Sequence, residues 1–554
     1  MKIFESKLDT KSKEFKERKK FLKILLEELN SKSVETKEHD KSRLAKLAEK
    51  GKQSAREKIK RVLDKNSPAT EIGLFAADGM YEEIKGGYKS AGVVTVIGEV
   101  AGKKCVIVAN DPLVKSGAWV EITCKKNLRA QEIAMENHLP IIYMVDSAGV
   151  NLERQAEIFP DKEHFGRIFR NNAKLSAMGI PQISCVFGFC VAGGAYLPAM
   201  SSELAMITGN ANMFLAGPFL VKSALGQDVD MATLGGAEMH NAVSGVADYQ
   251  FDTEDEAFDW IRNQMALIGA QKKLGLAREK AIEPKLDPDE LLGILPADLG
   301  GKYDVREIIG RIVDGSELEE YKKKYGKTIV TCFARIGGFS VGIVANQGMS
   351  VKKEMPLDHT GKSQPPQIQM GNVIYSDSAK KAANFIMLCN ERRIPLVFMQ
   401  DVTGFMVGTK AENEGIIKDG AQFVNVQANS VVPKFTVILR NSFGAGNYAM
   451  CGKAYDPRLI VGWPTTRLAV MDGGIAANTV LYTKRDLSDS EKEEFYERIK
   501  AKYEKEMSPY YLAARMMLDA VIDPRDTRNL LIQGLEMADH NPDMPAYLTG
   551  VLRT

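Results

Sequence analysis

The sequence has seven cysteines, but no two of them are spaced as CxxC and no group of cysteines and histidines has the spacing of a zinc site. Most of the cysteines stand in apolar runs, which predicts buried thiols in a reducing compartment. Only six histidines occur, and none is close in sequence to Cys190 or Cys451. A cysteine–histidine nucleophile would therefore need residues that meet only in the fold. The sequence predicts no metal site.

Long apolar runs and an excess of one charge are also absent. No run of about 18 apolar residues occurs, and the first residues, MKIFESKLDTKSKEF, lack the apolar core of a signal peptide. We therefore expect a cytoplasmic protein with no direct membrane insertion. The 74 lysines and arginines are offset by 72 acidic residues, leaving a net charge of +2. This balance gives no reason to expect a nucleic-acid partner.

What the sequence does contain is an internal repeat. With 554 residues the chain is too long for one ordinary core. The offset between Asp146 and Asp401 is 401 − 146 = 255 residues, and between Gly194 and Ala445 it is 445 − 194 = 251. Two similar α/β domains with covered parallel sheets are predicted, at residues 66–290 and 291–554, after an N-terminal helical extension at 1–65. The matching passages are Gly102–Asn110 with Gly338–Asn346, Leu139–Gly149 with Ile394–Gly404, and Ile180–Phe187 with Val432–Leu439.

Each half also contains a small-residue turn between a strand pattern and a helix pattern. The turns lie in Phe187–Met200 (FGFCVAGGAYLPAM) and Arg440–Cys451 (RNSFGAGNYAMC). Small residues leave amides at a helix start open, so that they can receive a developing oxyanion. The alternative is that small residues only allow close packing of helix on strand. Two such turns favour function, and predict two anion sites formed by Gly193, Gly194, Gly444, Ala445 and Gly446.

Other polar residues are ambiguous at this level. Asp146 and Asp401 end strand patterns, where ligands often bind, but such residues can also cap the following helix. His164 and His240 are expected to be structural hydrogen-bonding groups. Residues 350–373 are rich in proline, glycine and polar residues, which predicts a long inserted loop. Such a loop can be a lid, a contact surface or a disordered excursion.

Nine passages of the chain resemble the carboxyltransferase (β) subunits of biotin-dependent acyl-CoA carboxylases, above all methylcrotonoyl-CoA and geranoyl-CoA carboxylase β. The resemblance implies two tandem crotonase-like (ClpP/crotonase superfamily) domains and a hexamer whose active sites join the N-domain of one subunit to the C-domain of another. The passages are Lys126–Asn137, Phe159–Phe169, Phe214–Gln227, Leu234–Asp248, Tyr303–Ser316, Phe405–Gly408, Glu414–Ala421, Phe443–Gly452 and Ile522–Arg528.

The same resemblance implies the reaction and the roles of individual residues. Carboxybiotin releases CO2, and the enolate of the acyl-CoA attacks it. Gly193 and Gly194 would stabilise the enolate oxygen, and Gly444 and Ala445 the ureido oxygen of biotin. Residues expected to contact acyl-CoA are Lys126, Arg129, Ala192, Ala195, Asn346 and Gly348, although the two cations could equally be the charged face of a helix. Residues expected to contact biotin are Phe443, Gly446 and Phe405.

The resemblance also shows what the chain lacks. It has neither a Met-Lys-Met biotin-attachment sequence nor the glycine-rich ATP loop of a biotin carboxylase, so a partner subunit is expected to carry biotin. Val150–Leu152 and Gly117–Glu121 depart from the methylcrotonoyl pattern, and Gly117-AWV is similar to the α subunit of glutaconyl-CoA decarboxylase. A biotin-dependent decarboxylase, a biotin-independent crotonase-like hydratase or thioesterase, and a scaffold without activity remain the alternatives.

Overall fold

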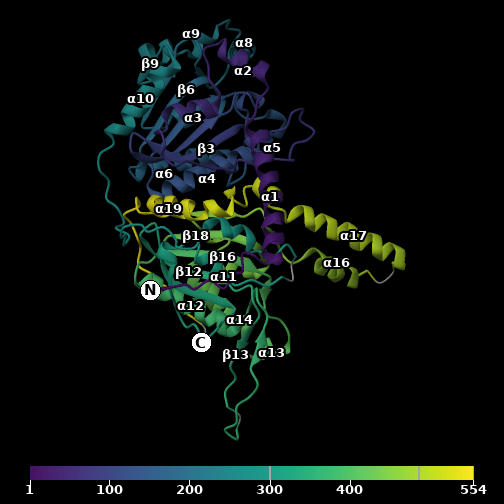
Figure 1. The fold of residues 1–554 in the computed structure, drawn as a ribbon. Coiled ribbons are helices and arrows are strands. Elements are labelled where there is room, and N and C mark those ends of the chain that lie inside the picture. The colour runs from purple at the N-terminus through teal and green to yellow at the C-terminus, as the bar shows by residue number, and fades with distance from the viewer. Residues whose placement is uncertain (299–300, 358, 485–486, 553–554) are drawn as a thin grey trace. The chain divides into compact units, whose positions relative to one another are not determined.

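The computed structural model describes residues 1–298, 301–357, 359–484 and 487–552. The chain forms two compact units, which we call the N-unit (Lys32–Lys273 with Ala513–Met516) and the C-unit (Met1–Ser31, Leu274–Leu512 and Met517–Thr554). Helices α1 and α18 each belong partly to both units. The expected mixture of helices and strands is present in each unit (Figure 1).

The N-unit is built on one sheet with the order β2-β3-β4-β5-β6-β7-β9, in which β8 also pairs with β6. The first three strands are antiparallel and the rest are parallel. The strands are β2 (Thr70–Ile72), β3 (Val93–Val100), β4 (Lys103–Asn110), β5 (Ile141–Ser147), β6 (Gln182–Val191), β7 (Glu203–Ile207), β8 (Asn212–Phe214) and β9 (Tyr249–Phe251). The helices are α2 (Lys41–Ala48), α3 (Ala55–Val62), α4 (Glu121–Asn137), α5 (Gln155–Ile158), α6 (Phe165–Ala177), α7 (Tyr196–Ala199), α8 (Pro218–Leu225), α9 (Met231–Gly235) and α10 (Glu254–Leu267).

The C-unit repeats this plan in the order β1-β10-β11-β12-β16-β18-β19-β21, with β20 beside β18. Its strands are β1 (Lys2–Ile3), β10 (Glu317–Glu320), β11 (Ile329–Ile336), β12 (Phe339–Asn346), β16 (Leu396–Val402), β18 (Lys434–Phe443), β19 (Leu459–Gly462), β20 (Arg467–Ala469) and β21 (Ala520–Val521), and β15 (Val373–Ile374) pairs with β17 (Gly404–Phe405) outside this sheet. Its helices are α1 (Lys13–Lys37), α11 (Val305–Ile309), α12 (Ser376–Glu391), α13 (Thr409–Asn413), α14 (Ile416–Ala428), α15 (Ala445–Ala449), α16 (Gly473–Tyr482), α17 (Asp489–Glu506), α18 (Pro509–Ala514) and α19 (Thr527–Ala538).

The internal repeat is confirmed strand by strand. In each unit an antiparallel hairpin, β3–β4 or β11–β12, leads into parallel strands with the same neighbours. The central strands β5 and β16 are buried along their whole length. Because both faces of these strands are covered, they are continuous apolar runs rather than alternating ones. This is why the two halves are recognisable in the sequence.

The N-terminal residues do form helices, but not a separate extension. Strand β1 pairs with β10 of the C-unit, and the side chain of Phe15 on α1 fills the space beside Gly293. Residues from Lys32 onward, including α2 and α3, belong to the N-unit. The division between the units falls at 273/274, whereas the boundary predicted from the sequence lay at 290/291. Packing partners decide this division, and they are not visible in the local pattern.

The insertion at 350–373 is partly regular. Strands β13 (Val351–Lys353) and β14 (Gln367–Gln369) pair antiparallel and form the arm labelled β13 in Figure 1. The prediction of a loop was therefore wrong for the two ends of the segment. Its base is held by Gln369, whose amide donates to the Asp377 carboxylate at 3.2 Å. In the described part of the chain, no helix is both long enough and apolar enough to cross a membrane.

Candidate active site

The small-residue turn of the N-unit follows β6 directly. Ala192 lies in the left-handed region with φ 57°, and a single helical turn, Ala192–Ala195, then leads into α7. The first amides of such a turn have no partner within the helix. Gly193 and Gly194 are partly exposed. A Cβ atom at Gly194 would meet nothing within 4 Å, so there is open space beside this residue of the turn.

An aromatic row lies behind this turn. A Cβ atom at Gly193 would lie 3.2 Å from Phe165. The Phe165 ring packs edge-on against Trp119 and Phe169, with centroids 5.2 and 5.0 Å away, and Phe169 in turn contacts Tyr196 at 6.2 Å. The turn is therefore open on one face and supported by rigid rings on the other. Such support suits a site that has to hold amides in a constant direction.

The turn of the C-unit also has a positive φ at its first residue. Gly444 has φ 55°, close to the φ of Ala192, and α15 starts at the next residue. The offset of these two residues is 444 − 192 = 252, so Gly193 corresponds to Ala445 and Gly194 to Gly446. The amide of Gly444 donates to the Ala469 carbonyl at 3.1 Å. This bond corrects our assignment of Gly444 as an oxyanion donor: the equivalent amides are those of Ala445 and Gly446.

A cavity of about 530 Å³ opens beside this second turn. Gly444 and Ala445 lie at its edge, and most of its remaining walls are aliphatic or aromatic. The sequence pattern did not indicate these walls, because they come from three separate segments that meet only in the fold. They are Asn447, Tyr448, Leu468, Ala469, Val470, Tyr503, Glu506, Tyr511, Leu512 and Met517.

The structure corrects the role expected for Lys126. Its side chain is fully buried, and its ammonium donates to the carbonyls of Ser90 and Val93 at 3.1 and 2.6 Å. Lys381 occupies the same place in the C-unit and donates to the Ile329 carbonyl at 2.9 Å. Both lysines brace the first strand of their hairpin. A side chain in this position does not reach a ligand phosphate, so Lys126 is not part of the site.

Burial lowers the pKa of Lys126 to about 7, which gives a test of this placement. Lysine in an unfolded chain titrates at a pKa of about 10.4, so between these two values the unfolded chain binds more protons. The stability from this group is complete above the unfolded pKa and is lost as pH falls toward 7. We expect the urea midpoint of the unsubstituted protein, measured by circular dichroism, to rise between pH 7.5 and 9.5. The midpoint of K126M should rise less over the same range. An unchanged slope would contradict the burial of a titrating ammonium.

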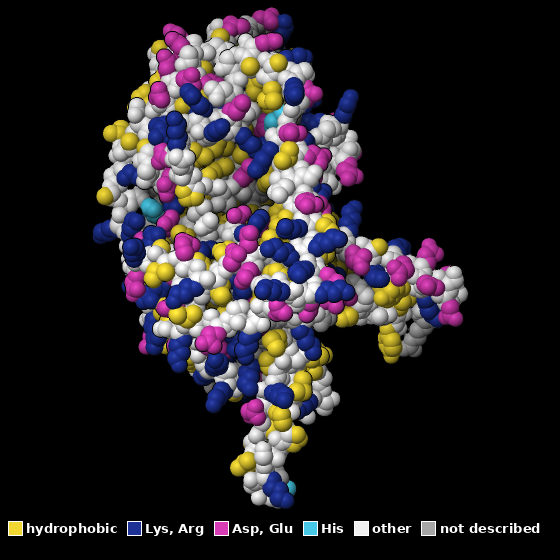
Figure 2. All heavy atoms as spheres, viewed as in Figure 1, with side chains coloured by type: hydrophobic (Ala, Val, Ile, Leu, Met, Phe, Trp, Pro, Cys, Tyr) yellow, Lys and Arg dark blue, Asp and Glu magenta, His cyan; other side chains and the backbone are white. Residues whose placement is uncertain are grey.

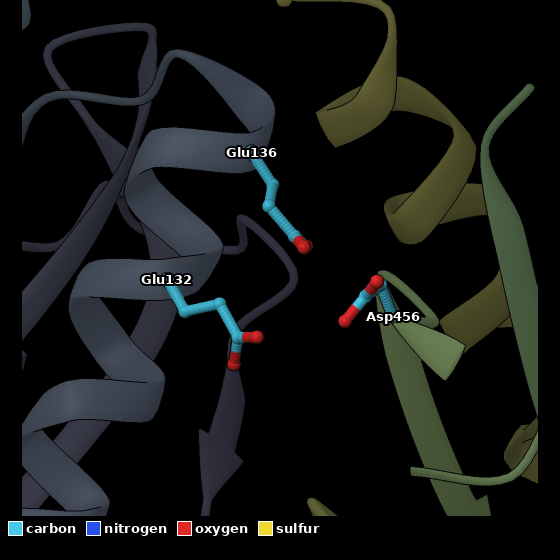
Figure 3. A group of neighbouring side chains, drawn as sticks. All are labelled: Glu132, Glu136 and Asp456. Atoms are coloured by element: carbon cyan, nitrogen blue, oxygen red, sulfur yellow. The ribbon is translucent and has the colours of Figure 1, made fainter. Parts of the chain in front are cut away.

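Arg129 is also largely buried and bonds to Glu132, with 2.6 Å between Nη1 and Oε2. Figure 3 shows Glu132 and Glu136 one turn apart on α4, pointing to the same side of the helix; Asp456, labelled with them, belongs to the C-unit. One partner of Arg129 is thus an acid on its own helix. This agrees with the structural alternative for Arg129 rather than with a phosphate contact.

The remaining expected contacts divide by exposure. Ala192 is exposed beside the first turn, whereas Ala195 is buried beneath it. Asn346 and Gly348 are buried in the C-unit, where Gly348 packs closely on Tyr303. Phe443 and Gly446 have buried side-chain positions, and Phe405 is half-buried against Gly420. Of this set only Ala192 offers an exposed side chain.

The cysteines beside the turns are not nucleophiles. Cys190 and Cys451 are both buried, and burial raises the pKa of each thiol, to about 11 for Cys451. His240 bonds to the Met213 carbonyl at 2.6 Å and to Ser244 at 2.9 Å, which agrees with its expected structural role.

Comparison with known proteins agrees with this geometry. The family model described as "Carboxyl transferase domain" matches residues 46–552. The chain belongs to the carboxyl transferase family and has its crotonase-like fold. Within that family it is of the methylcrotonyl-/geranyl-CoA carboxylase β-subunit type.

Several relatives support this closer placement. The chain is 44% identical over 540 residues to the biotin-dependent 3-methylcrotonyl-coenzyme A carboxylase beta1 subunit of Mycobacterium tuberculosis, covering 96% of both chains. It is 43% identical over 565 residues to the probable mitochondrial methylcrotonoyl-CoA carboxylase beta chain of Drosophila melanogaster, covering 97% of this chain and 93% of the relative. The crystal structure of the P. aeruginosa geranyl-CoA carboxylase beta subunit superimposes with a TM-score of 0.85 at 33% identity, over 99% of each chain.

Proposed function

We propose that the chain transfers CO2 from carboxybiotin, carried by a partner subunit, to the enolate of an acyl- or enoyl-CoA of the methylcrotonoyl type. The observation that carries this proposal is the pair of equivalent turns, whose first helical residues include exposed or partly exposed positions: Gly193 and Gly194 in the N-unit and Ala445 in the C-unit. The amides of Gly193 and Gly194 would receive the enolate oxygen. Those of Ala445 and Gly446 would receive the ureido oxygen of biotin. When bound, biotin supplies the CO2 and the base that takes the substrate proton.

The shape of the second site supports biotin as its occupant. The fused rings of biotin present one polar ureido edge and an otherwise apolar body. The cavity is lined by Gly444 and Ala445 of the turn and by apolar side chains that include Leu468, Val470 and Leu512. Its volume of about 530 Å³ lies in the range of small-ligand pockets. A site of this kind would bind the ring system of biotin by its shape and would orient it by a few hydrogen bonds.

We also propose a hexamer in which the N-unit of one subunit meets the C-unit of another. Large apolar side chains are exposed on α16, where Figure 2 shows yellow atoms on the α16–α17 pair. Ile475 and Tyr482 are 60% and 79% exposed. Exposed apolar clusters commonly mark interfaces. The seven free, buried cysteines also fit a reducing compartment such as the cytoplasm.

The test is biotin-dependent decarboxylation in the reverse direction. The purified protein would be incubated with free biotin and, separately, methylglutaconyl-, carboxygeranoyl-, methylmalonyl-, malonyl- and glutaconyl-CoA. We expect turnover only when biotin is present, and fastest with methylglutaconyl-CoA. Turnover without biotin would support a crotonase-like hydratase or thioesterase instead. No turnover with any thioester, even with a biotinylated partner, would overturn the proposal.

A further inference from the structure

Each turn is preceded by the same interruption of the sheet. Between β5 and β6 the register passes from Val145 opposite Val186 to Ser147 opposite Cys190, so β6 has two extra residues. Between β16 and β18 it passes from Gln400 opposite Ile438 to Val402 opposite Ser442, with the same surplus. The residues skipped on the shorter strands are Asp146 and Asp401. A bulge of this kind bends a strand and redirects the residues after it.

Both carboxylates lie inside these bulges. Asp146 is 3% exposed and accepts the amide of Phe189 at 3.1 Å, while its other oxygen is paired with Lys52. Asp401 is fully buried and accepts the amide of Asn441, also at 3.1 Å. In both cases an asparagine on the hairpin strand, Asn110 or Asn346, accepts the amide of the aspartate itself. The carboxylate thus replaces the strand bond that the bulge removes.

The C-unit carboxylate has further donors. The guanidinium of Arg440 lies 3.1 Å from it, and the Tyr303 hydroxyl donates to it at 2.9 Å. In the N-unit the residue equivalent to Arg440 is Gly188, where a Cβ atom would overlap the Asp146 carboxylate. The two units therefore neutralise the buried acid in different ways. What they share is the acid and its bond to the bulged strand.

The bulge decides where the turn lies. After it, Phe189–Val191 leaves β7 and pairs with β8, and Asn441–Phe443 leaves β19 and pairs with β20. Ala192 and Gly444 come immediately afterwards. The bonded amides of Phe189 and Asn441 are only four residues before Gly193 and Ala445. A shift of the bulge would therefore also move the amides of the turn.

We propose that Asp146 and Asp401 are positioning residues, each holding the bulge that aims one of the two amide pairs. Neither carboxylate is a ligand contact or a helix cap, which were the two roles suggested by their place at the strand ends. The inference about the backbone stands on the geometry, whereas its effect on catalysis rests on the proposed function. A misplacement of about 1 Å at a reacting centre can cost about a hundredfold in rate.

The experiment combines kinetics with hydrogen exchange of the full-length protein. D146N and D401N retain the side-chain shape and remove the charge. We expect faster exchange in the peptide spanning 189–199 for D146N only, and in the peptide spanning 441–451 for D401N only. In the reverse reaction kcat should fall about a hundredfold in each variant, with KM for the thioester little changed, because aimed amides act mainly in the transition state.

Matched controls exist at the other end of the same sheets. Asp64 accepts the amides of Ala101 and Gly102 and pairs with Arg262, while Asp314 accepts those of Gly337 and Gly338 and pairs with Arg528. D64N and D314N should leave exchange at both turns unchanged. If they loosen the turns as much as D146N and D401N do, the carboxylates are only general stabilisers and the proposal is wrong.

Two further variants cover the case in which D146N or D401N fails to fold. G188A keeps the charge pair but displaces the Asp146 carboxylate, and Y303F removes one donor to Asp401 without changing the ring. Each should loosen its own turn and lower kcat. Unchanged exchange at the turn in folded variants would overturn the proposal. Should the wild-type protein show no biotin-dependent turnover, the proposed function fails, and hydrogen exchange still decides whether the carboxylates hold the turns.

Discussion

Replacing Gly194 by leucine is expected to abolish biotin-dependent turnover while leaving the protein folded. A Cβ atom at this position would meet nothing within 4 Å, and the φ of Gly194 is not among the positive values. The backbone therefore accepts leucine without strain. The new side chain would occupy the open space beside the first turn, where the proposed function requires the thioester oxygen to approach. Loss of a preorganised oxyanion site costs about 10²–10³-fold in rate, and blocking access should cost at least this much.

G194L would be tested by measuring both its rate in the reverse reaction and its melting temperature. G269L is the matched control, because Gly269 also has open space around its Cβ position and lies in the same unit, away from the turn. It should retain full activity. A445L should extend into the cavity beside Leu468 and raise KM for free biotin. If the turns are only packing devices, G194L will lose stability in step with activity, and no separate catalytic effect will be found.

The second large effect concerns stability and uses the internal repeat as its own control. Gly102 and Gly338 occupy the same position, the tight turn between the two strands of the hairpin, and have φ values of 72° and 84°. A Cβ atom at Gly102 would meet nothing within 4 Å, whereas one at Gly338 would overlap the carbonyl oxygen of Glu279. That carbonyl is fixed, because the Glu279 amide donates to Gly338 at 2.9 Å.

We therefore expect G102A to cost only about 1 kcal/mol, the usual penalty of alanine in the left-handed region. G338A should cost about 3 kcal/mol or more, since a backbone overlap is added to the same strain. The two variants would be compared by urea unfolding, following the tryptophan signal and circular dichroism together. Equal losses of stability would mean that the Ala277–Glu279 segment moves away from residue 338 easily. The hydrogen bond between Glu279 and Gly338 would then not hold the segment in place.

Several features were predictable because they depend on local pattern. The repeat appears in the sequence because buried parallel strands are continuous apolar runs, and the turns appear because only small residues permit their backbone shape. Helix α17 likewise depends on neighbouring residues, since a capping box of Ser488 and Glu491 begins it. The family follows from long passages such as Phe443–Gly452, and the matching family model covers residues 46–552.

Other features depend on segments that are distant in the sequence. Lys126 has the sequence context of a helix surface, and it is buried because the hairpin strand beginning at Val93 packs over it. The sequence pattern aligns Gly444 with Gly193, but in the structure the amide of Gly444 donates to the carbonyl of Ala469 on β20. The walls of the second cavity come from segments up to 73 residues apart, from Gly444 to Met517 (517 − 444 = 73). Local composition carries no signal for such contacts.

The sequence by itself thus determined the class of fold, its duplication and the two turns, since each of these depends on residues that are neighbours along the chain. Only the tertiary structure decided which residues of the turns are exposed, which charges are buried, and that Asp146 and Asp401 stand in equivalent bulges. The physical reason is the same in each case. Hydrogen-bond partners and burial depend on what packs against a residue, and in this protein the decisive partners arrive from other strands.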